Sequence, residues 1–338
     1  MNIRTFFLSV CLFLGLGSYG QVDLQRPLPA DPNTVVGKLP NGITYYIRHN
    51  EEPKDRASFY IIRNVGALLE NDDQNGLAHF LEHMAFNGTK NFPGKGIITT
   101  LEKYGVTFGG NINAYTAQNE TVYNISAVPA TDVRLLDTCL LILHDWSYYL
   151  TLDGDEIDAE RGVISEEWRT RRTPQFRLLA QTLPVLFKDS KYAERDVIGD
   201  LDIIKNFKHQ TIRDFYREWY RTDLEAIAVV GDFDVARMEQ RVKEIFSSIP
   251  TVENPKPRPF FEIPGHEEIY YCLATGKEVQ QSSVSITTIL PGMKAEEKQT
   301  HQYLKSNLLV TLCNSMIGAR IGELMQQPNP PFLGGSIG

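Results

Sequence analysis

The stretch from residue 76 to residue 87, GLAHFLEHMAFN, combines the pattern of a buried helix with ionisable side chains. Its larger apolar residues recur at steps of three and four, which predicts a helix with one buried stripe. They are Leu77, Phe80, Leu81 and Met84. His79 and His83 are four residues apart, so they lie one turn apart on a single face, and Glu82 borders that face. Two imidazoles and a carboxylate beside apolar surface are costly without a common partner. A divalent metal ion would be such a partner.

A third metal ligand is expected in the acidic segment from residue 155 to residue 168, DEIDAERGVISEEW. A catalytic zinc site takes three protein ligands, and a carboxylate commonly joins two histidines. Glu160 and Glu167 are seven residues apart and share one face of the predicted helix, whereas Glu166 is rotated by about a quarter turn. The residues alone leave Glu160 and Glu167 both open as the ligand. A solvated acidic face, or a buried polar cluster without metal, is the alternative interpretation.

Composition places the chain among globular proteins. Of its 338 residues, 42% are apolar and 22% are charged, and the length accommodates two domains. The formal net charge is -8 and no basic cluster is present, which argues against nucleic acid as a partner. Beyond the N-terminal segment the cysteines, Cys139, Cys272 and Cys313, are far apart and lack zinc-ligand spacing.

Residues 1–20 have the features of a cleavable signal peptide. Arg4 gives a short basic start, and an apolar run follows from Thr5 to Leu16. This run is shorter than the roughly 20 residues that cross a bilayer, so cleavage after Gly20 is favoured over a membrane anchor. Lipidation of Cys11 is a further alternative, and no later segment is expected to span a membrane. We therefore expect a secreted or periplasmic protein.

Strands and helices alternate along residues 21–246, which predicts an α+β fold arranged as an α/β sandwich. Polar residues 71–73 precede the motif helix and are suited to cap it. The expected strands lie within residues 34–50, 57–68 and 226–234, with a hairpin within 105–128. The other expected helices cover residues 97–103, 130–150, 153–172, 211–219 and 235–246.

A proline-rich segment from residue 247 to residue 265 shows no periodicity and predicts an interdomain linker. Residues 266–338 are then expected to begin a second domain. The segments 268–274 and 282–290 have the composition of strands, and a helix is expected from Glu296 to Gly318. Since about 73 residues are short for a domain, this second domain is expected to be incomplete.

Several segments resemble one family of metallopeptidases. The sequence HFLEHMAFNGTKNFP contains the inverted zinc motif His-x-x-Glu-His of the pitrilysin/insulinase family. Further resemblance lies in GGNINAYTAQNETVY, AERGVISEEW and NPPFLGGSIG, and it extends from about residue 34 to the last residue. The family fold is a repeated α+β unit whose two halves close over a peptide. The resemblance implies one such unit here, followed by an incomplete second unit of similar type.

The resemblance also implies roles for individual residues. His79 and His83 correspond to zinc-binding histidines, and Glu82 to the general base. Glu167 falls at the position of the third zinc ligand, and Glu160 at that of a glutamate near the metal but not bound to it.

The strand that contains Asn113 and Ala114 borders the cleft in the family, where it pairs with an extended substrate peptide. The expected function is therefore that of a zinc-dependent endopeptidase or oligopeptidase acting on extended or unfolded peptides. One alternative is a non-catalytic member that binds peptides or acts as a scaffold. Another is a fragment that is inactive without a C-terminal half, which in the family supplies an arginine and a tyrosine to the site.

Overall fold

A computed structural model describes residues 23–338 of the chain. These form two compact units, one of residues 31–290 and one that joins the segment up to residue 30 to residues 291–338. The predicted signal peptide and Cys11 lie outside the described residues. The expected domain limits, 21–246, 247–265 and 266–338, stay a prediction.

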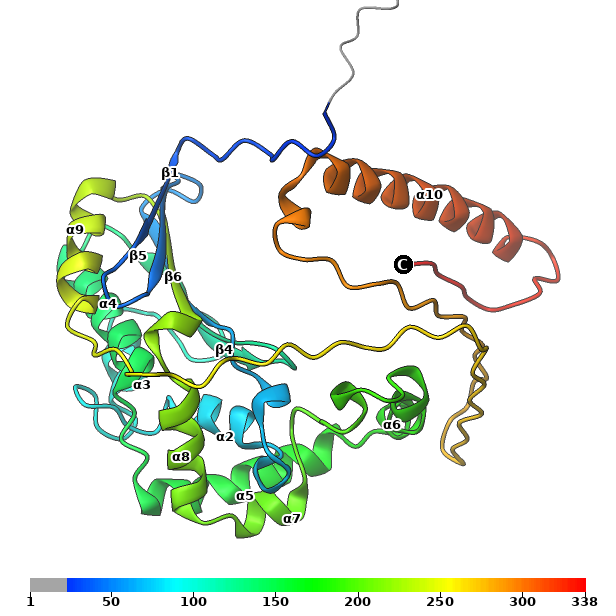
Figure 1. Ribbon diagram of the computed structural model, residues 1–338, viewed down its shortest axis with the longest axis horizontal. Helices are drawn as coiled ribbons and strands as arrows, with labels where there is room; N and C mark the ends of the chain where they lie inside the picture. Colours follow the sequence, from blue (N-terminus) through cyan, green and yellow to red (C-terminus); the bar gives the residue numbers. More distant parts are fainter. Residues whose placement is uncertain (1–22) are drawn as a thin grey trace, which may run out of the picture. The chain divides into compact units, whose positions relative to one another are not determined.

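The larger unit is built on one six-stranded mixed sheet (Figure 1). Its strands are β1 (Thr34–Lys38), β2 (Thr44–His49), β3 (Arg56–Arg63), β4 (Ile112–Thr116), β5 (Thr121–Pro129) and β6 (Glu225–Gly231). They lie in the order β1-β2-β6-β3-β5-β4, in which only β2 and β6 are parallel. Strand β4 therefore forms one edge of the sheet. The predicted hairpin is the pair β4–β5.

Alternating burial explains why the central strands form. Along β3 and β6 every second residue is buried, so one face of each strand packs into the core. Phe59 and Ile61 on β3 and Ile227 and Val229 on β6 are fully buried. On this face β6 and β3 thus present mainly apolar side chains to the core, and a buried ion pair between Arg63 and Glu225 lies at one end of it.

Helices fall into two groups in Figure 1. The helices α4 (Val133–Tyr148) and α9 (Val235–Phe246) contact each other and the sheet. The second group surrounds α2 (Leu77–Met84), which contacts β4, β5, α5 and α8. Its other members are α5 (Gly154–Arg171), α8 (His209–Trp219) and α7 (Leu201–Asn206), which contacts α5. The short helix α3 covers Gly96–Glu102. A further helix, α6, covers Pro174–Leu186.

Aspartate side chains cap the N-termini of four of these helices. At α7, Asp200 accepts from the Asp202 and Ile203 amides. Asp132 accepts from the Arg134 amide at α4, Asp153 from the Asp155 amide at α5, and Asp234 from the Arg237 amide at α9. A carboxylate that precedes a helix satisfies an amide with no partner within the helix. These caps explain why the observed starts of α4, α5 and α9 lie within three residues of the predicted ones.

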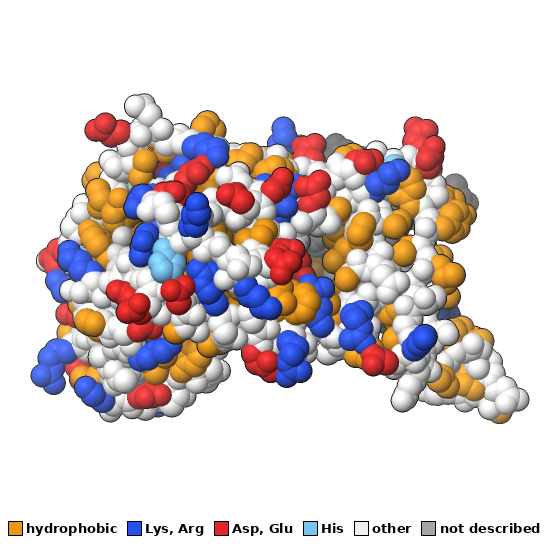
Figure 2. Space-filling model, turned by 90° about the horizontal axis from the view of Figure 1, so that it is seen from below, with side chains coloured by type: hydrophobic (Ala, Val, Ile, Leu, Met, Phe, Trp, Pro, Cys, Tyr) orange, Lys and Arg blue, Asp and Glu red, His pale blue; other side chains and the backbone are white. Residues whose placement is uncertain are grey.

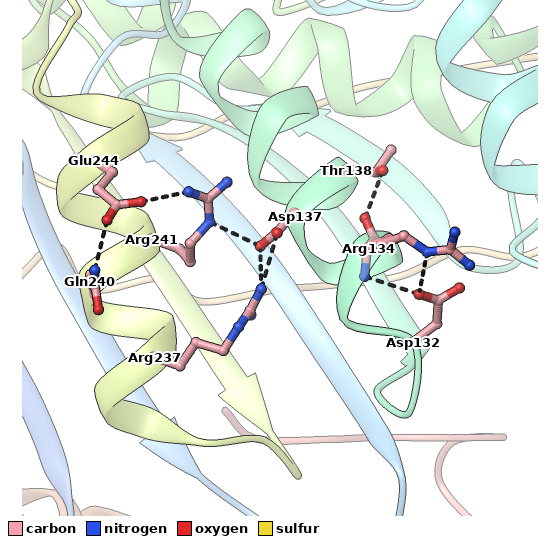
Figure 3. Close-up of polar contacts among 8 residues, drawn as sticks. All are labelled: Asp132, Arg134, Asp137, Thr138, Arg237, Gln240, Arg241 and Glu244. Carbon is pink, nitrogen blue, oxygen red and sulfur yellow. Dashed lines mark hydrogen bonds and ion pairs between the residues drawn. The ribbon is translucent and has the colours of Figure 1, made fainter.

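An ionic network joins α4 to α9 (Figure 3). Both Asp137 oxygens on α4 accept from Arg237 Nη2 at 3.0 Å, and Oδ1 also accepts from Arg241 Nε at 3.2 Å. Arg241 in turn donates to Glu244 at 2.5 Å. Asp137 on α4 pairs with both arginines of α9, so it ties the two helices together.

The two strands expected after the linker do not form. Within the described residues, neither 268–274 nor 282–290 pairs with another strand, and Tyr271 and Ile286 are 86% and 95% exposed. Strand composition is not sufficient, because a strand also needs a neighbour for its amides and carbonyls. This part of the prediction is wrong for the structure.

The smaller unit contains the predicted helix as α10 (His301–Met325), which follows a short turn at Glu297–Gln299. The helix begins later than expected because the Thr300 side chain accepts from the Tyr303 amide and caps it there. By length and composition the helix could cross a membrane, since an 18-residue stretch of it has a mean hydropathy of 1.3, although the sequence predicted no such segment. The helix includes the charged residues Lys305, Arg320 and Glu323.

Acidic and basic side chains are interspersed on the face of the molecule drawn in Figure 2. On this face of the described residues, neither sign of charge forms a broad continuous area.

Candidate active site

His79, Glu82 and His83 all lie on helix α2, at the border between the interior of the larger unit and its surface. The apolar residues of the helix are buried, as the periodicity predicts; they include Leu77, Phe80, Leu81 and Met84. His79 is also buried, whereas Glu82 and His83 are partly exposed. Burial of the stripe therefore anchors the helix, while the polar positions remain available for chemistry.

The predicted cap of α2 is wrong. Residues 71–73 belong to a separate short turn, Asp72–Gln74, in which Asn71 and Gln74 form a capping box. Helix α2 is capped instead by the fully buried Glu70, whose Oε2 accepts from the Gly76 amide at 3.0 Å and whose Oε1 accepts from the Ala78 amide at 2.8 Å. Glu70 lies outside the polar run, so only the folded loop brings it to the helix.

Helix α5 places Glu167 opposite both histidines. Glu167 Oε2 lies 3.6 Å from His79 Nε2 and 3.2 Å from His83 Nε2. One donor atom from each of the three residues falls within 4.8 Å of the others. The second Glu167 oxygen, Oε1, pairs with Arg171 at 2.6 Å. Two histidine nitrogens and one carboxylate oxygen therefore converge on one point.

Glu160 makes a different contact. Its Oε1 accepts from His83 Nδ1 at 2.8 Å, so it faces the ring nitrogen on the other side from Glu167. A carboxylate on the outer nitrogen of a histidine fixes the orientation of the ring and leaves the inner nitrogen available to a metal. Glu166 points elsewhere and pairs with Arg169. The two glutamates left open by the sequence thus occupy distinct positions.

The surroundings shift the protonation of both histidines. Burial, with the nearby His83 charge, lowers the pKa of His79 below its usual value. Burial also disfavours a charged His83, but hydrogen bonds to Glu160 and Glu167 outweigh it and raise the pKa of His83 to about 9. The hydrogen bond to His83 lowers the pKa of Glu167. Without a metal, a proton on His83 thus keeps the carboxylates of Glu160 and Glu167 ionised. A divalent cation would take the place of this proton.

The residues present fit a zinc ion. Two imidazole nitrogens and a carboxylate oxygen are the donor set of one class of catalytic zinc site, which keeps a further position for substrate or water. The Glu160–His83 contact supplies the outer carboxylate that such sites commonly contain. The roles of His79, His83, Glu167 and Glu160 stay predictions, and their arrangement agrees with them.

Glu82 is held by a residue that the sequence analysis did not single out. Thr116, the last residue of β4, donates its hydroxyl to Glu82 Oε2 at 2.6 Å. Burial raises the pKa of Glu82, partly offset by this bond, so the carboxylate is a stronger base than an exposed glutamate. One feature of the sequence indicated that Thr116 belongs to the site: it lies in the segment NAYT, on the strand expected at the cleft.

Strand β4 also carries Asn113 and Ala114. Both are partly buried, and β4 pairs with β5 on one side only. On its other backbone edge, β4 is bridged at Ile112 by the loop at Phe108, and no strand lies beside the rest of that edge among the described residues. Since Thr116 on the same strand touches Glu82, this edge leads directly to the cluster of polar residues.

Comparisons with known proteins identify the family. The insulinase family, peptidase family M16, matches residues 45–184, and the inactive domain of peptidase family M16 matches residues 206–319. The probable zinc protease PqqL of Haemophilus influenzae is 40% identical over 228 residues, 68% of this chain and 24% of that protein. Its namesake in Escherichia coli is 33% identical over 304 residues, 89% of this chain and 32% of that protein.

Solved structures agree with the sequence relatives. The crystal structure of the periplasmic protease PqqL from Escherichia coli superimposes with a TM-score of 0.74 at 30% identity, covering 89% of this chain and 33% of that one. Pitrilysin shares the fold, with a TM-score of 0.57 at 20% identity over 72% of this chain and 26% of that chain. The chain thus spans about a quarter to a third of the length of the curated relatives it matches first. It belongs to the insulinase family of peptidases, peptidase family M16, and has the α+β fold of that family.

Proposed function

We propose that this chain holds the zinc site of a peptidase that hydrolyses peptide bonds in extended or unfolded peptides. The observation that carries the proposal is the convergence of His79, His83 and Glu167 within 4.8 Å, with Glu82 between the histidines in sequence and held by Thr116. The names of the relatives as zinc proteases support zinc as the metal.

His79, His83 and Glu167 would hold the ion, while Glu160 keeps the His83 ring in place. Zinc, when bound, supplies a Lewis acid that polarises a peptide carbonyl and makes water a stronger acid. Glu82 accepts the proton of the attacking water. Within the part of the chain that the structure describes, Thr116 holds the carboxylate through Oε2 and leaves Oε1 without a side-chain donor, so Oε1 is the oxygen better suited to take the proton, which Glu82 then returns to the leaving amine.

The peptide would lie along the open edge of β4. A strand that lacks a neighbour binds an extended peptide through backbone hydrogen bonds, with little demand on the side chains of the peptide. Asn113 and Ala114 are the proposed contacts, since they lie on β4 next to the strand end that touches Glu82. This mode would favour unfolded substrates, because most backbone groups of a folded protein are already hydrogen-bonded within it.

Residues outside this chain would complete the catalytic cleft. The relatives named PqqL are much longer than this chain, and we propose a C-terminal half or partner subunit that closes over the peptide. A cleaved signal peptide at residues 1–20 and a periplasmic or secreted location belong to the same proposal, supported by the name of the periplasmic relative from Escherichia coli. Non-catalytic peptide binding is the alternative function.

The proposal is tested by zinc content and peptide hydrolysis in the chain joined to the proposed C-terminal half. His83→Ala should lose bound zinc, since it removes one of three donors. Glu82→Gln should keep zinc and lose hydrolysis, because an amide does not accept the proton. Hydrolysis by the Glu82→Gln variant would place the base elsewhere. Zinc binding and peptide binding without any hydrolysis in the unchanged protein would favour the non-catalytic alternative.

A further inference from the structure

The Glu160 carboxylate has a second partner beyond His83. Its Oε1 accepts from His83 Nδ1 at 2.8 Å, and its Oε2 accepts from Asn87 Nδ2 at 2.5 Å. Glu160 and Asn87 are 7% and 3% exposed, so neither bond is readily replaced by water. With a donor on each oxygen, the carboxylate is fixed in rotation as well as in position.

Lys95 determines which way the Asn87 amide faces. Its ammonium group lies against Asn87 Oδ1 as a donor. An ammonium group only donates hydrogen bonds, so it requires the amide oxygen on its own side and leaves the amide NH2 toward Glu160. Rotation of the amide by a half turn would bring its oxygen against the carboxylate and its NH2 against the ammonium, both repulsive. A chain of polar contacts therefore runs from the surface through Lys95, Asn87 and Glu160 to His83.

The loop that carries Asn87 is held firmly in place. The buried Asp145 on α4 accepts from the Thr89 hydroxyl at 2.7 Å, and from the backbone and side chain of Asn91 at 2.7 and 2.8 Å. The Gly88 carbonyl accepts from the Thr151 hydroxyl at 2.9 Å. Asn87 is thus anchored independently of Glu160, and it can hold the carboxylate rather than follow it.

We propose that Asn87 and Lys95 are positioning residues of the zinc site. Through Glu160 they fix the His83 ring so that Nε2 faces the point where His79 and Glu167 converge. Neither residue touches that point itself. The inference rests on the proposed zinc function and adds two residues that the motif and the acidic helix do not contain.

The test is zinc affinity, measured by competition with a chelator on the full chain. Asn87→Leu keeps the approximate size of the side chain and removes the donor. It should weaken zinc binding by about 10- to 100-fold, the range for loss of a group that orients a ligand. Lys95→Met should cause a smaller loss, because the amide is no longer oriented but still reaches Glu160. Cobalt(II) absorption should change in Asn87→Leu, since it reports the arrangement of the ligands.

The chain offers matched controls. Asn206→Leu removes an exposed asparagine at the end of α7 that donates to the Asp202 carbonyl. Lys90→Met removes an exposed lysine that lies over the Tyr149 ring. Both should leave zinc affinity and the cobalt spectrum unchanged. Melting of the zinc-free proteins shows whether a variant is folded, so loss of affinity at an unchanged melting temperature supports positioning.

A double variant provides the sharpest outcome. If Asn87 acts through Glu160, Asn87→Leu should have no further effect on zinc affinity in a Glu160→Ala chain. Additive losses would overturn the proposed route, and equal zinc affinities of Asn87→Leu and Asn206→Leu would overturn the inference as a whole. Zinc binding by the unchanged chain no tighter than by His83→Ala would overturn the proposed function, and the inference with it.

Discussion

Glu160 and Glu167 are chemically identical residues on one helix face, yet their contacts separate their roles. Glu167 faces the Nε2 atoms of both histidines, whereas Glu160 meets His83 at Nδ1 and is held from behind by Asn87. A metal between the Nε2 atoms is within reach of Glu167. Glu160 reaches it only through the imidazole ring.

The two glutamates should therefore respond differently to removal of their charge. Glu167→Gln replaces a donor to the metal and should reduce zinc affinity the more severely. Glu160→Gln should keep measurable zinc and reduce affinity or activity by about 10- to 100-fold. Titration of each variant with a competing chelator distinguishes them. Easier release of zinc from Glu160→Gln than from Glu167→Gln would make Glu160 the third ligand.

At the scale of elements, helix α2 depends on a buried acid for its first turn. Glu70 is fully buried and satisfies the Gly76 and Ala78 amides. Burial raises the pKa of Glu70 to about 8, even though those amides and the nearby Arg195 and Lys191 favour the charged form. The cap of the motif helix is consequently protonated over much of the neutral range.

Protonation of Glu70 links the stability of the fold to pH. Because the folded-state pKa is raised, the native protein binds a proton that the unfolded chain releases above about pH 4.5. The proton on Glu70 therefore contributes its full stabilisation of the folded state below about pH 4.5, and this contribution is lost as the pH rises toward about 8. The free energy of unfolding should fall in this window by up to about 1.4 kcal/mol per pH unit from this group.

Glu70→Gln isolates this contribution, since glutamine does not titrate. Between pH 5 and pH 8, the free energy of unfolding of the zinc-free variant, measured with denaturant, should fall less steeply with pH than that of the unchanged protein. The two slopes should differ by about 1.4 kcal/mol per pH unit, the value for one proton. The absolute stability of the variant should be lower at acid pH, because one of the two amides loses its acceptor. Parallel pH profiles of the two proteins would show that Glu70 does not carry the dependence.

At the scale of the whole molecule, the proposed site joins distant parts of the chain. His79 and His83 come from α2, and Glu167 comes from α5, which is separated from α2 in sequence by α3, β4, β5 and α4. A metal shared between the two helices stabilises the folded state, because the unfolded chain does not bring these donors together.

Zinc should accordingly raise the melting temperature. At a zinc concentration about 100 times the dissociation constant, the gain is about 2.7 kcal/mol. For a unit of this size that corresponds to a rise of about 5–10 °C. Melting with zinc and with excess chelator measures the difference, and His79→Ala should melt at the same temperature in both. An equal zinc-dependent rise in His79→Ala would locate the bound metal at another site.

The local features of the site could be predicted from the sequence because a helix has a fixed repeat. The i, i+4 spacing of His79 and His83 places them on one face wherever the helix lies, and the apolar stripe indicates which side is buried. The strands that alternate in burial, and the helices that start after an aspartate, were predictable for the same reason. Each depends on interactions within a few residues or on a simple repeat.

Only the tertiary structure decided contacts between distant segments. Glu70 replaced residues 71–73 as the cap of α2. Asn87 and Lys95 contact the site although no local pattern marked them, and Thr116 was marked only by its place on the strand expected at the cleft. The segments 268–274 and 282–290 had strand composition but found no neighbour to pair with. Helical spacing made Glu160 and Glu167 equivalent, and the packing of α5 on α2 made them different. Spacing along a chain sets the direction of a side chain on its own element, but its partners depend on how that element packs.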